Sequence, residues 1–182
     1  MSAWIFFIGG SSASGKSTVA NEIAKTWGLP VIRIDNYRDI IDEINLPNDT
    51  ATAVTKALSL QVVTHLVCSG AQCVVEGAWI TPAQASKFRQ SGFFHPVFCG
   101  YPNADPARRY DIILSRGGSK ERHWLCARSR NEAIAFLRKK IASSVAEQVE
   151  CNQFDIKFVD CTDFGEGASE VLKLFEHQWQ LR

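Results

Sequence analysis

The sequence predicts an α/β protein in which a five-stranded parallel sheet lies between two layers of helices. Five short apolar segments alternate with longer segments of helical periodicity, which is typical of a parallel sheet covered on both faces. The first apolar segment, residues 4–8, is unbroken, as a strand buried on both faces requires. A loop at residues 10–17 joins this strand to a helix expected over residues 18–27, where apolar residues recur at helical spacing.

Residues 10–17 fit the phosphate-loop pattern G-x-x-x-x-G-K-[ST] in full, in the strand–loop–helix context that this motif needs. Backbone N–H groups of such a loop surround phosphate oxygens, and the start of the helix adds partial positive charge. Lys16 is expected to reach the β- and γ-phosphates of a nucleotide, and the Ser17 hydroxyl to hold Mg²⁺. The expected nucleotide-binding residues are Gly10, Ser11, Ser12, Ala13, Ser14, Gly15, Lys16, Ser17 and Thr18. The alternative is a Gly/Ser-rich turn without a ligand.

The remaining strands and helices follow from apolar runs, periodicity and capping residues. Further strands are expected at residues 29–34, 73–75, 96–101 and 156–160. Further helices are expected around residues 40–44 and at 48–68, 82–90, 105–116 and 167–178. A long helix is also expected after the charged stretch 116–130, ending at about residue 151. Residues 48–50 are expected to cap the helix at 48–68, whose apolar face would comprise Val54, Leu58, Val62 and Leu66. Thr81, Pro82 and Gln84 form the pattern of a capping box with proline at the first helical position.

Two acidic residues directly follow buried strands. Asp35 follows the second expected strand and Glu76 the third, at the sheet edge where ligands of parallel sheets bind. One acid there could accept a proton from an attacking hydroxyl, and the other could hold Mg²⁺ or orient the acceptor. The alternatives are a turn-forming role for Asp35 and a structural salt bridge for Glu76.

Composition restricts the class of protein. The chain has 182 residues, 46% of them hydrophobic, which suits a single domain over residues 1–182 with a full core. A net charge of +1 gives no general basic field, so no nucleic-acid partner is expected. The six cysteines contain no C-x-x-C pair and are expected to be reduced, mostly buried thiols. No stretch approaches the roughly 20 apolar residues that span a bilayer, so we expect no membrane partner and a cytoplasmic location.

The phosphate loop, Asp35-Asn36-Tyr37 and the Val-Val-Glu-Gly sequence at residues 74–77 together resemble P-loop small-molecule kinases of the nucleoside and nucleoside-monophosphate kinase group. They are most similar to uridine-kinase-like and related metabolite kinases, and residues 9–12 also resemble the loop of chloramphenicol phosphotransferase. The resemblance implies a three-layer fold with strand order 2-3-1-4-5, ATP and Mg²⁺ as cofactors, and Asp35 as the base. It also implies that residues 36–50 bind the acceptor.

The resemblance further implies a lid after the fourth strand, at residues 116–130. Asp105 and Arg116 keep the family's spacing of an Asp-Pro helix start and a later arginine, although Ile112 stands where the family has another arginine. Arg116 and Arg122 are the expected lid cations, since the transferring phosphoryl group carries negative charge. Other cations of this region are expected to face solvent: Arg108, Arg109, Arg128, Arg130, Arg138 and Lys139.

The acceptor site is expected to involve Asp35, Tyr37, Arg38, Glu76 and Trp79. Trp79 could stack on a planar acceptor or cover the core. The metal is expected at Ser17 and Glu76.

Three functions compete at this point. The first is an ATP-dependent kinase that phosphorylates a hydroxyl of a small molecule or nucleoside. The second is a kinase with a different acceptor, either a nucleotide phosphate, for which Arg33 and Arg38 flank Asp35, or an antibiotic. The third is a nucleotide-driven ATPase or switch, because a phosphate loop alone does not specify the output. Asn-Lys-x-Asp of GTPases and the Asp-Glu strand end of motor ATPases are both missing from the sequence. The sequence leaves the acceptor's identity and the oligomeric state open.

Overall fold

The computed structural model describes residues 3–117 and 124–180. Five strands form one sheet in the order β2-β3-β1-β4-β5, and every neighbouring pair is parallel. The strands are β1 (Trp4–Gly10), β2 (Val31–Arg33), β3 (Gln72–Glu76), β4 (Phe94–Gly100) and β5 (Lys157–Asp160). The predicted fold class and strand order are therefore confirmed.

Seven α-helices and one short 3₁₀ helix connect and cover these strands within the described residues. They are α1 (Lys16–Trp27), α2 (Asn36–Glu43), α3 (Asn48–Ser69), α4 (Pro82–Arg89), α5 (Pro106–Gly117), η1 (Trp124–Ala127), α6 (Arg130–Gln153) and α7 (Phe164–Gln180). The capping box at α4 is confirmed, because the Thr81 hydroxyl accepts from the Gln84 N–H and the Gln84 side chain accepts from the Thr81 N–H. Helix α2 begins directly after Asp35, earlier than predicted.

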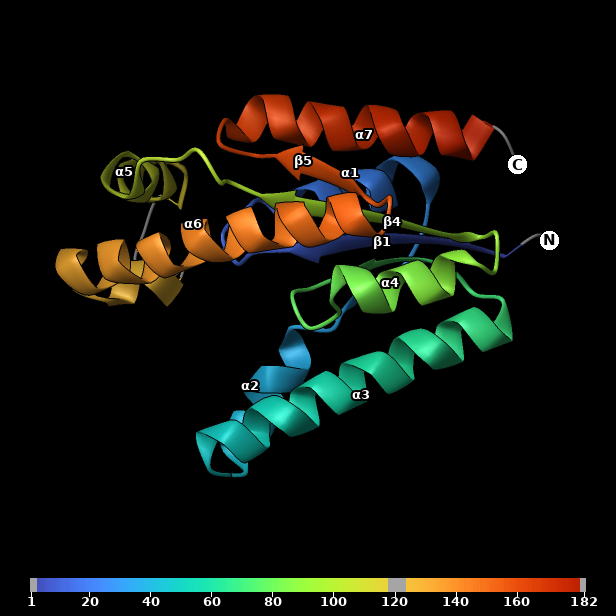
Figure 1. Cartoon of the computed structure of the whole chain (residues 1–182), viewed down its shortest axis with the longest axis horizontal. Helices are drawn as coiled ribbons and strands as arrows, with labels where there is room; N and C mark the ends of the chain where they lie inside the picture. Colours follow the sequence, from blue (N-terminus) through green and yellow to red (C-terminus); the bar gives the residue numbers. More distant parts are fainter. Residues whose placement is uncertain (1–2, 118–123, 181–182) are drawn as a thin grey trace.

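The sheet is the middle of three layers. Phe6 and Ile8 of β1 point toward α1 and α7, where they pack against Ile23 and Phe175. Ile5 and Phe7 of the same strand point to the opposite face, which α3, α4 and α6 cover. Figure 1 shows α7 on one side of the sheet and α3 with α4 on the other. The unbroken apolar sequence of β1 therefore has the double burial that it predicts.

A third apolar cluster lies beyond the carboxyl ends of the strands and ties α5, η1 and α6 together. It contains Tyr101, Tyr110, Ile113, Leu125 and Leu137, and Ala13 of the phosphate loop packs against it. The cluster therefore fixes the start of α6 next to the loop that the sequence identifies as the nucleotide site.

The orientation of α3 differs from the prediction. Val54 and Leu58 are 41% and 40% exposed, whereas the buried residues of the helix are Ala51, Thr55, Ser59 and Val63. Helix α3 packs against α2, and its buried residues at positions 51, 55 and 59 are small. The predicted apolar face is therefore wrong at Val54 and Leu58, whereas Leu66 packs against the core as predicted.

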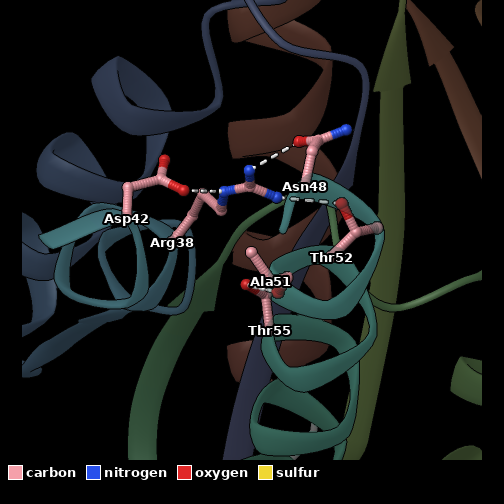
Figure 2. Close-up of polar contacts among 6 residues, drawn as sticks. All are labelled: Arg38, Asp42, Asn48, Ala51, Thr52 and Thr55. Atoms are coloured by element: carbon pink, nitrogen blue, oxygen red, sulfur yellow. Dashed lines mark hydrogen bonds and ion pairs between the residues drawn. The ribbon is translucent and has the colours of Figure 1, made fainter. Parts of the chain in front are cut away.

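The predicted cap of α3 is also wrong. The N-cap residue is Pro47, and no side chain caps the helix. The Asn48 side chain instead accepts a hydrogen bond from Arg38 of α2 (2.8 Å), as Figure 2 shows. The Asn48 side-chain oxygen, which was expected to cap α3, therefore binds Arg38 of the preceding helix instead.

By length and composition, α3 could also cross a membrane, which differs from our expectation that no segment approaches that length. The same test is passed by helices that cover a sheet. In this structure Val63 of α3 is fully buried in the core beside Val75 of β3, and Leu60 and Leu66 pack against the same cluster. One such helix is therefore weak support for a membrane segment.

The six cysteines are free thiols, and all but Cys68 are buried, which confirms the predicted burial.

Candidate active site

A cavity of about 790 Å³ opens at the carboxyl edge of the sheet, where the sequence places its candidate residues. The phosphate loop forms one side of it, and the segments after β2 and β3 form the other. Helices α5 and α6 and the start of α7 each add a residue. The lining residues are residues 12–18 of the phosphate loop and the start of α1, together with Arg33, Asp35, Asn36, Arg38, Asp39, Glu76, Ala78, Trp79, Ile113, Lys140 and Phe164.

The phosphate loop has the backbone that its sequence requires. At Gly10, φ is +110°, and a Cβ there would lie 2.2 Å from the carbonyl oxygen of Cys99, so only glycine fits this close approach to β4. Ala13 also has a positive φ, of 63°, a conformation that non-glycine residues adopt at a cost and mainly at functional sites. The Lys16 ammonium is buried and donates to the Ser11 carbonyl oxygen at 2.9 Å. Lys16 therefore lies folded along its own loop.

Side chains from two directions hold the start of the loop in place. The Ser11 hydroxyl donates to the Glu147 carboxylate of α6 at 2.9 Å and accepts from the Ser144 hydroxyl at 3.0 Å. The Tyr101 hydroxyl donates to the Ser12 carbonyl oxygen at 2.7 Å. Ser11 is thus a buried structural residue of the loop, whereas residues 12–18 line the cavity.

Glu76 lies at the centre of the site and is only 2% exposed. Its carboxylate accepts from the Ser17 hydroxyl at 3.0 Å and lies 3.4 Å from Nε of Arg33. Burial raises the pKa of Glu76, against the opposing effects of Lys16, the Ser17 hydrogen bond and Arg33. The salt bridge that we considered as a structural alternative is therefore present, and it lies inside the cavity with Ser17.

Asp35 faces the same cavity from the start of α2. Its Oδ1 accepts from the Ala78 N–H at 2.7 Å, which fixes the carboxylate to the turn after β3. Gly77 makes this contact possible, because a Cβ there would lie 2.3 Å from Ile34 and 2.8 Å from Oδ1 of Asp35. Within the part of the chain that the structure describes, no hydrogen bond occupies Oδ2, so this oxygen is available to a ligand.

Arg38 lines the cavity but uses its guanidinium to join α2 to α3. Figure 2 shows the three contacts, to Asp42 (2.7 Å), Thr52 (2.9 Å) and Asn48 (2.8 Å). Trp79 packs against the core, as one of its two expected roles requires, and it also lines the cavity. Tyr37 packs against that core cluster and, among the described residues, does not line the cavity.

Arg109 is a correction to the sequence analysis, which placed it in solvent. It is 1% exposed and donates to the carbonyl oxygens of Cys161 (2.6 Å) and Ala13 (2.8 Å). Its guanidinium lies between the rings of Tyr101 and Phe164, 3.9 Å from each centroid. Arg109 therefore joins the phosphate loop to the segment after β5. The signal that could have revealed it is its spacing of four residues from Ile113, which is buried on the same helix.

The other cations that the sequence placed in solvent are exposed, namely Arg108, Arg128, Arg130, Arg138 and Lys139. Lys140, the next residue of α6, was missed, and it lines the cavity. Of the expected lid cations, Arg122 lies outside the described residues. Arg116 is in the last turn of α5, and its side chain is likewise outside the described part.

The oxygen atoms at the site suit Mg²⁺. Ser17 and Glu76 provide a hydroxyl and a carboxylate in contact, and magnesium in phosphoryl-transfer sites uses one or two such protein oxygens together with phosphate and water. The described residues contain no group of three or more His, Cys, Asp or Glu side chains that would form an all-protein metal site. The donor set therefore fits a metal held jointly with a nucleotide.

Comparison with protein-family models and with curated protein sequences finds no match. Solved structures do share the fold. A shikimate kinase from Bacteroides thetaiotaomicron has a TM-score of 0.63 at 14% identity, over 98% of this chain and 99% of that one. A shikimate kinase from Acinetobacter baumannii, in complex with shikimate, has a TM-score of 0.60 at 14% identity, with 97% and 94% covered. A gluconokinase from Sinorhizobium meliloti 1021 has a TM-score of 0.57 at 20% identity, with 98% and 97% covered. The chain thus has the three-layer fold of these P-loop kinases.

Proposed function

We propose that this chain is an ATP- and Mg²⁺-dependent kinase that transfers the γ-phosphoryl group to a hydroxyl of a small molecule. One observation carries the proposal: the Lys16 end of a complete phosphate loop and the carboxylate of Asp35 face the same cavity. A nucleotide whose phosphates lie in the loop would present its γ-phosphoryl group toward the acid that can activate an acceptor.

The chemistry assigned to Asp35 is general base catalysis. Its Oδ2 would accept the proton of the acceptor hydroxyl while the hydroxyl oxygen forms a bond to the γ-phosphorus. The bond from that phosphorus to the β,γ-bridging oxygen breaks, and ADP leaves with those electrons. The hydrogen bond from the Ala78 N–H to Oδ1 would keep the carboxylate in this orientation throughout the reaction.

Lys16 and the loop would stabilise the phosphate charge. The Lys16 ammonium now satisfies the Ser11 carbonyl oxygen, and nucleotide binding would supply β- and γ-phosphate oxygens as stronger acceptors. Ser17 and Glu76 would hold Mg²⁺, which when bound would neutralise charge on the β- and γ-phosphates. Arg33, beside Glu76, would limit the repulsion between that carboxylate and the phosphates.

Residues 36–50 are proposed as the acceptor side of the site and residues 116–130 as its lid. Helix α2 supplies Asn36, Arg38 and Asp39 to the cavity wall, and the turn after β3 adds Trp79. The solved neighbours named shikimate kinase and gluconokinase support a small-molecule acceptor. A uridine-kinase-like reaction, suggested by Asp35 after β2, and an antibiotic acceptor both fit within this proposal.

A nucleotide acceptor is less well supported, because the two arginines that favoured it are engaged. Arg33 pairs with Glu76 and Asn21, and Arg38 makes three hydrogen bonds between α2 and α3. A phosphate acceptor would have to displace these partners.

The proposal is tested by measuring Mg²⁺-dependent ATP consumption against a panel of nucleosides, nucleotides, sugars, hydroxy acids, vitamins and antibiotics. A kinase should be slow until its acceptor is present, whereas an ATPase or switch should ignore every compound. The variant Lys16→Ala should abolish stimulated consumption and keep the fold, because this side chain serves the loop and its ligand. Near-normal transfer by Lys16→Ala would overturn the assignment of the loop.

A further inference from the structure

Helix α6 lies directly against the start of the phosphate loop. The carbonyl oxygen of Lys140 lies 3.0 Å from the Ser144 hydroxyl and 3.5 Å from the Ser11 hydroxyl. Ser144 and Ser11 are both buried, and the two hydroxyls contact each other at 3.0 Å. The helical turn that carries Lys140 is therefore fixed relative to the loop by buried polar contacts and by the packing of Leu137 in the core.

The side chain of Lys140 extends from this turn into the wall of the cavity. Its ammonium lies 5.5 Å from the ring centroid of Phe136, toward the outer limit of about 6 Å for a cation–π contact. Among the described residues, no hydrogen bond or ion pair engages this ammonium. Lys140 is therefore a cavity-facing cation that no described polar partner holds.

The other described cations of the cavity are engaged. Lys16 donates to the Ser11 carbonyl oxygen, and Arg33 lies against Glu76. Arg38 joins α2 to α3 through three hydrogen bonds. A charged group that lines a site without being used in the fold is a candidate for binding the ligand's charge.

The charge of Lys140 affects Glu147, the carboxylate that binds Ser11 of the phosphate loop. Burial raises the pKa of Glu147, and the Ser11 hydrogen bond and the ammonium groups of Lys16 and Lys140 oppose that increase. Glu147 is itself occupied by the Ser11 hydroxyl at 2.9 Å. The two lysines thus act on the same region, from the loop and from α6 respectively, and the carboxylate between them is bound to the loop.

We propose that Lys140 is a catalytic residue of this site and contacts the terminal phosphate of the bound nucleotide. This rests on the proposed function for its role in turnover, where a second cation besides Lys16 would stabilise the charge that spreads over the transferring phosphoryl oxygens. Lys140 differs from Arg116 and Arg122, the cations that the sequence suggested, because it lies on α6, after the expected lid.

Binding of nucleotides tests the contact without any acceptor. The affinities of AMP, ADP and a non-hydrolysable ATP analogue, each with Mg²⁺, are measured by calorimetry for the unmodified chain, Lys140→Met, Lys140→Arg and Lys139→Met. Methionine keeps the length of the side chain and removes the charge, and Lys139 is the exposed neighbour on the same helix. Thermal melting of each variant checks that the fold is retained.

We expect Lys140→Met to weaken binding of the ATP analogue about tenfold or more, as loss of one hydrogen bond to a charged group would. The affinity for AMP should stay unchanged, Lys140→Arg should restore most of the loss, and Lys139→Met should behave as the unmodified chain. Equal losses for all three nucleotides, or unchanged binding of the ATP analogue, would overturn the proposal.

The same variants separate this inference from the proposed function. If no compound stimulates ATP consumption but Lys140→Met still loses its preference for the triphosphate, the kinase proposal fails and the contact stands. If a compound is phosphorylated and Lys140→Met retains both normal turnover and the triphosphate preference, the kinase proposal stands and the role of Lys140 is wrong.

Discussion

At the scale of single residues, burial of Glu76 disfavours the charged form of its carboxyl group. The carboxylate is buried beside Ser17, Lys16 and Arg33, and burial still raises its pKa above the ordinary value of 4.5. Because burial favours the neutral form of this carboxyl group, a bound cation would stabilise its charged form.

Glu76→Gln should therefore make the ligand-free chain more stable at neutral pH. With a raised folded pKa, the folded chain binds this proton more tightly than the unfolded chain does. Stability from this group is thus full below the unfolded pKa and is lost as pH rises through the folded pKa. The variant should lack that decline in thermal melts recorded as pH rises above the ordinary pKa of 4.5. A lower melting temperature than the unmodified chain throughout this range would contradict the account.

The same substitution should lower Mg²⁺-dependent turnover, because an amide is a much weaker ligand for magnesium than a carboxylate. Activity of Glu76→Gln should require a higher Mg²⁺ concentration for half-maximal rate, which a magnesium titration of ATP consumption measures. An unchanged magnesium requirement would remove Glu76 from the metal site.

Asp35→Asn should keep the bond to the Ala78 N–H and lose the proton acceptor. We expect a decrease in turnover of roughly 10²–10⁴ with nucleotide affinity unchanged, as loss of a general base would give. Steady-state rates and calorimetry of the ATP analogue measure the two quantities. Glu176→Gln, an exposed carboxylate of α7 outside the cavity, is the control. Unchanged turnover in Asp35→Asn would leave Asp35 as a turn residue only.

At the scale of elements, Arg109 connects parts of the chain that are distant in sequence. From α5 it reaches the carbonyl oxygens of Ala13 in the phosphate loop and Cys161 after β5. The rings of Tyr101 and Phe164 on either side shield these bonds from water. The shape of the loop therefore depends on a helix that follows it by almost one hundred residues, about half of the chain.

Arg109→Met should destabilise the chain by about 2–4 kcal/mol, because the buried carbonyl oxygens lose their donor and the guanidinium its stacking. Denaturant unfolding measures this, with Arg108→Met as an exposed control on the same helix. Nucleotide affinity should fall for AMP as well as for the triphosphate, since the whole loop is loosened, in contrast to Lys140→Met. A stability equal to that of the control variant would contradict the role of Arg109.

Helices also mark where sequence reasoning failed. The pattern of Val54 and Leu58 predicts a buried stripe on α3, yet these two residues are exposed and Ala51 and Thr55 are buried instead. Arg109 and Lys140 are cations in helices, and most such residues are solvated, so residue type alone did not indicate their positions, although the spacing of Arg109 from Ile113 was a local signal. Their places in the structure depend on segments far away in sequence: Arg109 donates to the carbonyl oxygen of Cys161, and the Lys140 backbone lies against Ser11 of the phosphate loop.

At the scale of the whole molecule, the site could be predicted where local sequence and sheet geometry suffice. A parallel sheet puts the carboxyl ends of its strands at one edge, so residues after β1, β2 and β3 had to meet there. Lys16, Asp35 and Glu76 do line one cavity, as that argument requires. The strand order came from the family resemblance and is confirmed, whereas the acceptor depends on a wall built from α2 and the turn after β3, which residue types do not specify.

The proposed reaction of the whole molecule is transfer of a phosphoryl group from ATP to an alcohol oxygen in this cavity. We would test it by phosphorus NMR of the reaction of the full chain with Mg²⁺, ATP and the compound that most stimulates ATP consumption. We expect a new phosphate monoester that grows in step with ADP and is missing when Asp35→Asn replaces the unmodified chain. Inorganic phosphate as the sole new product, formed at the same rate with and without the compound, would contradict it.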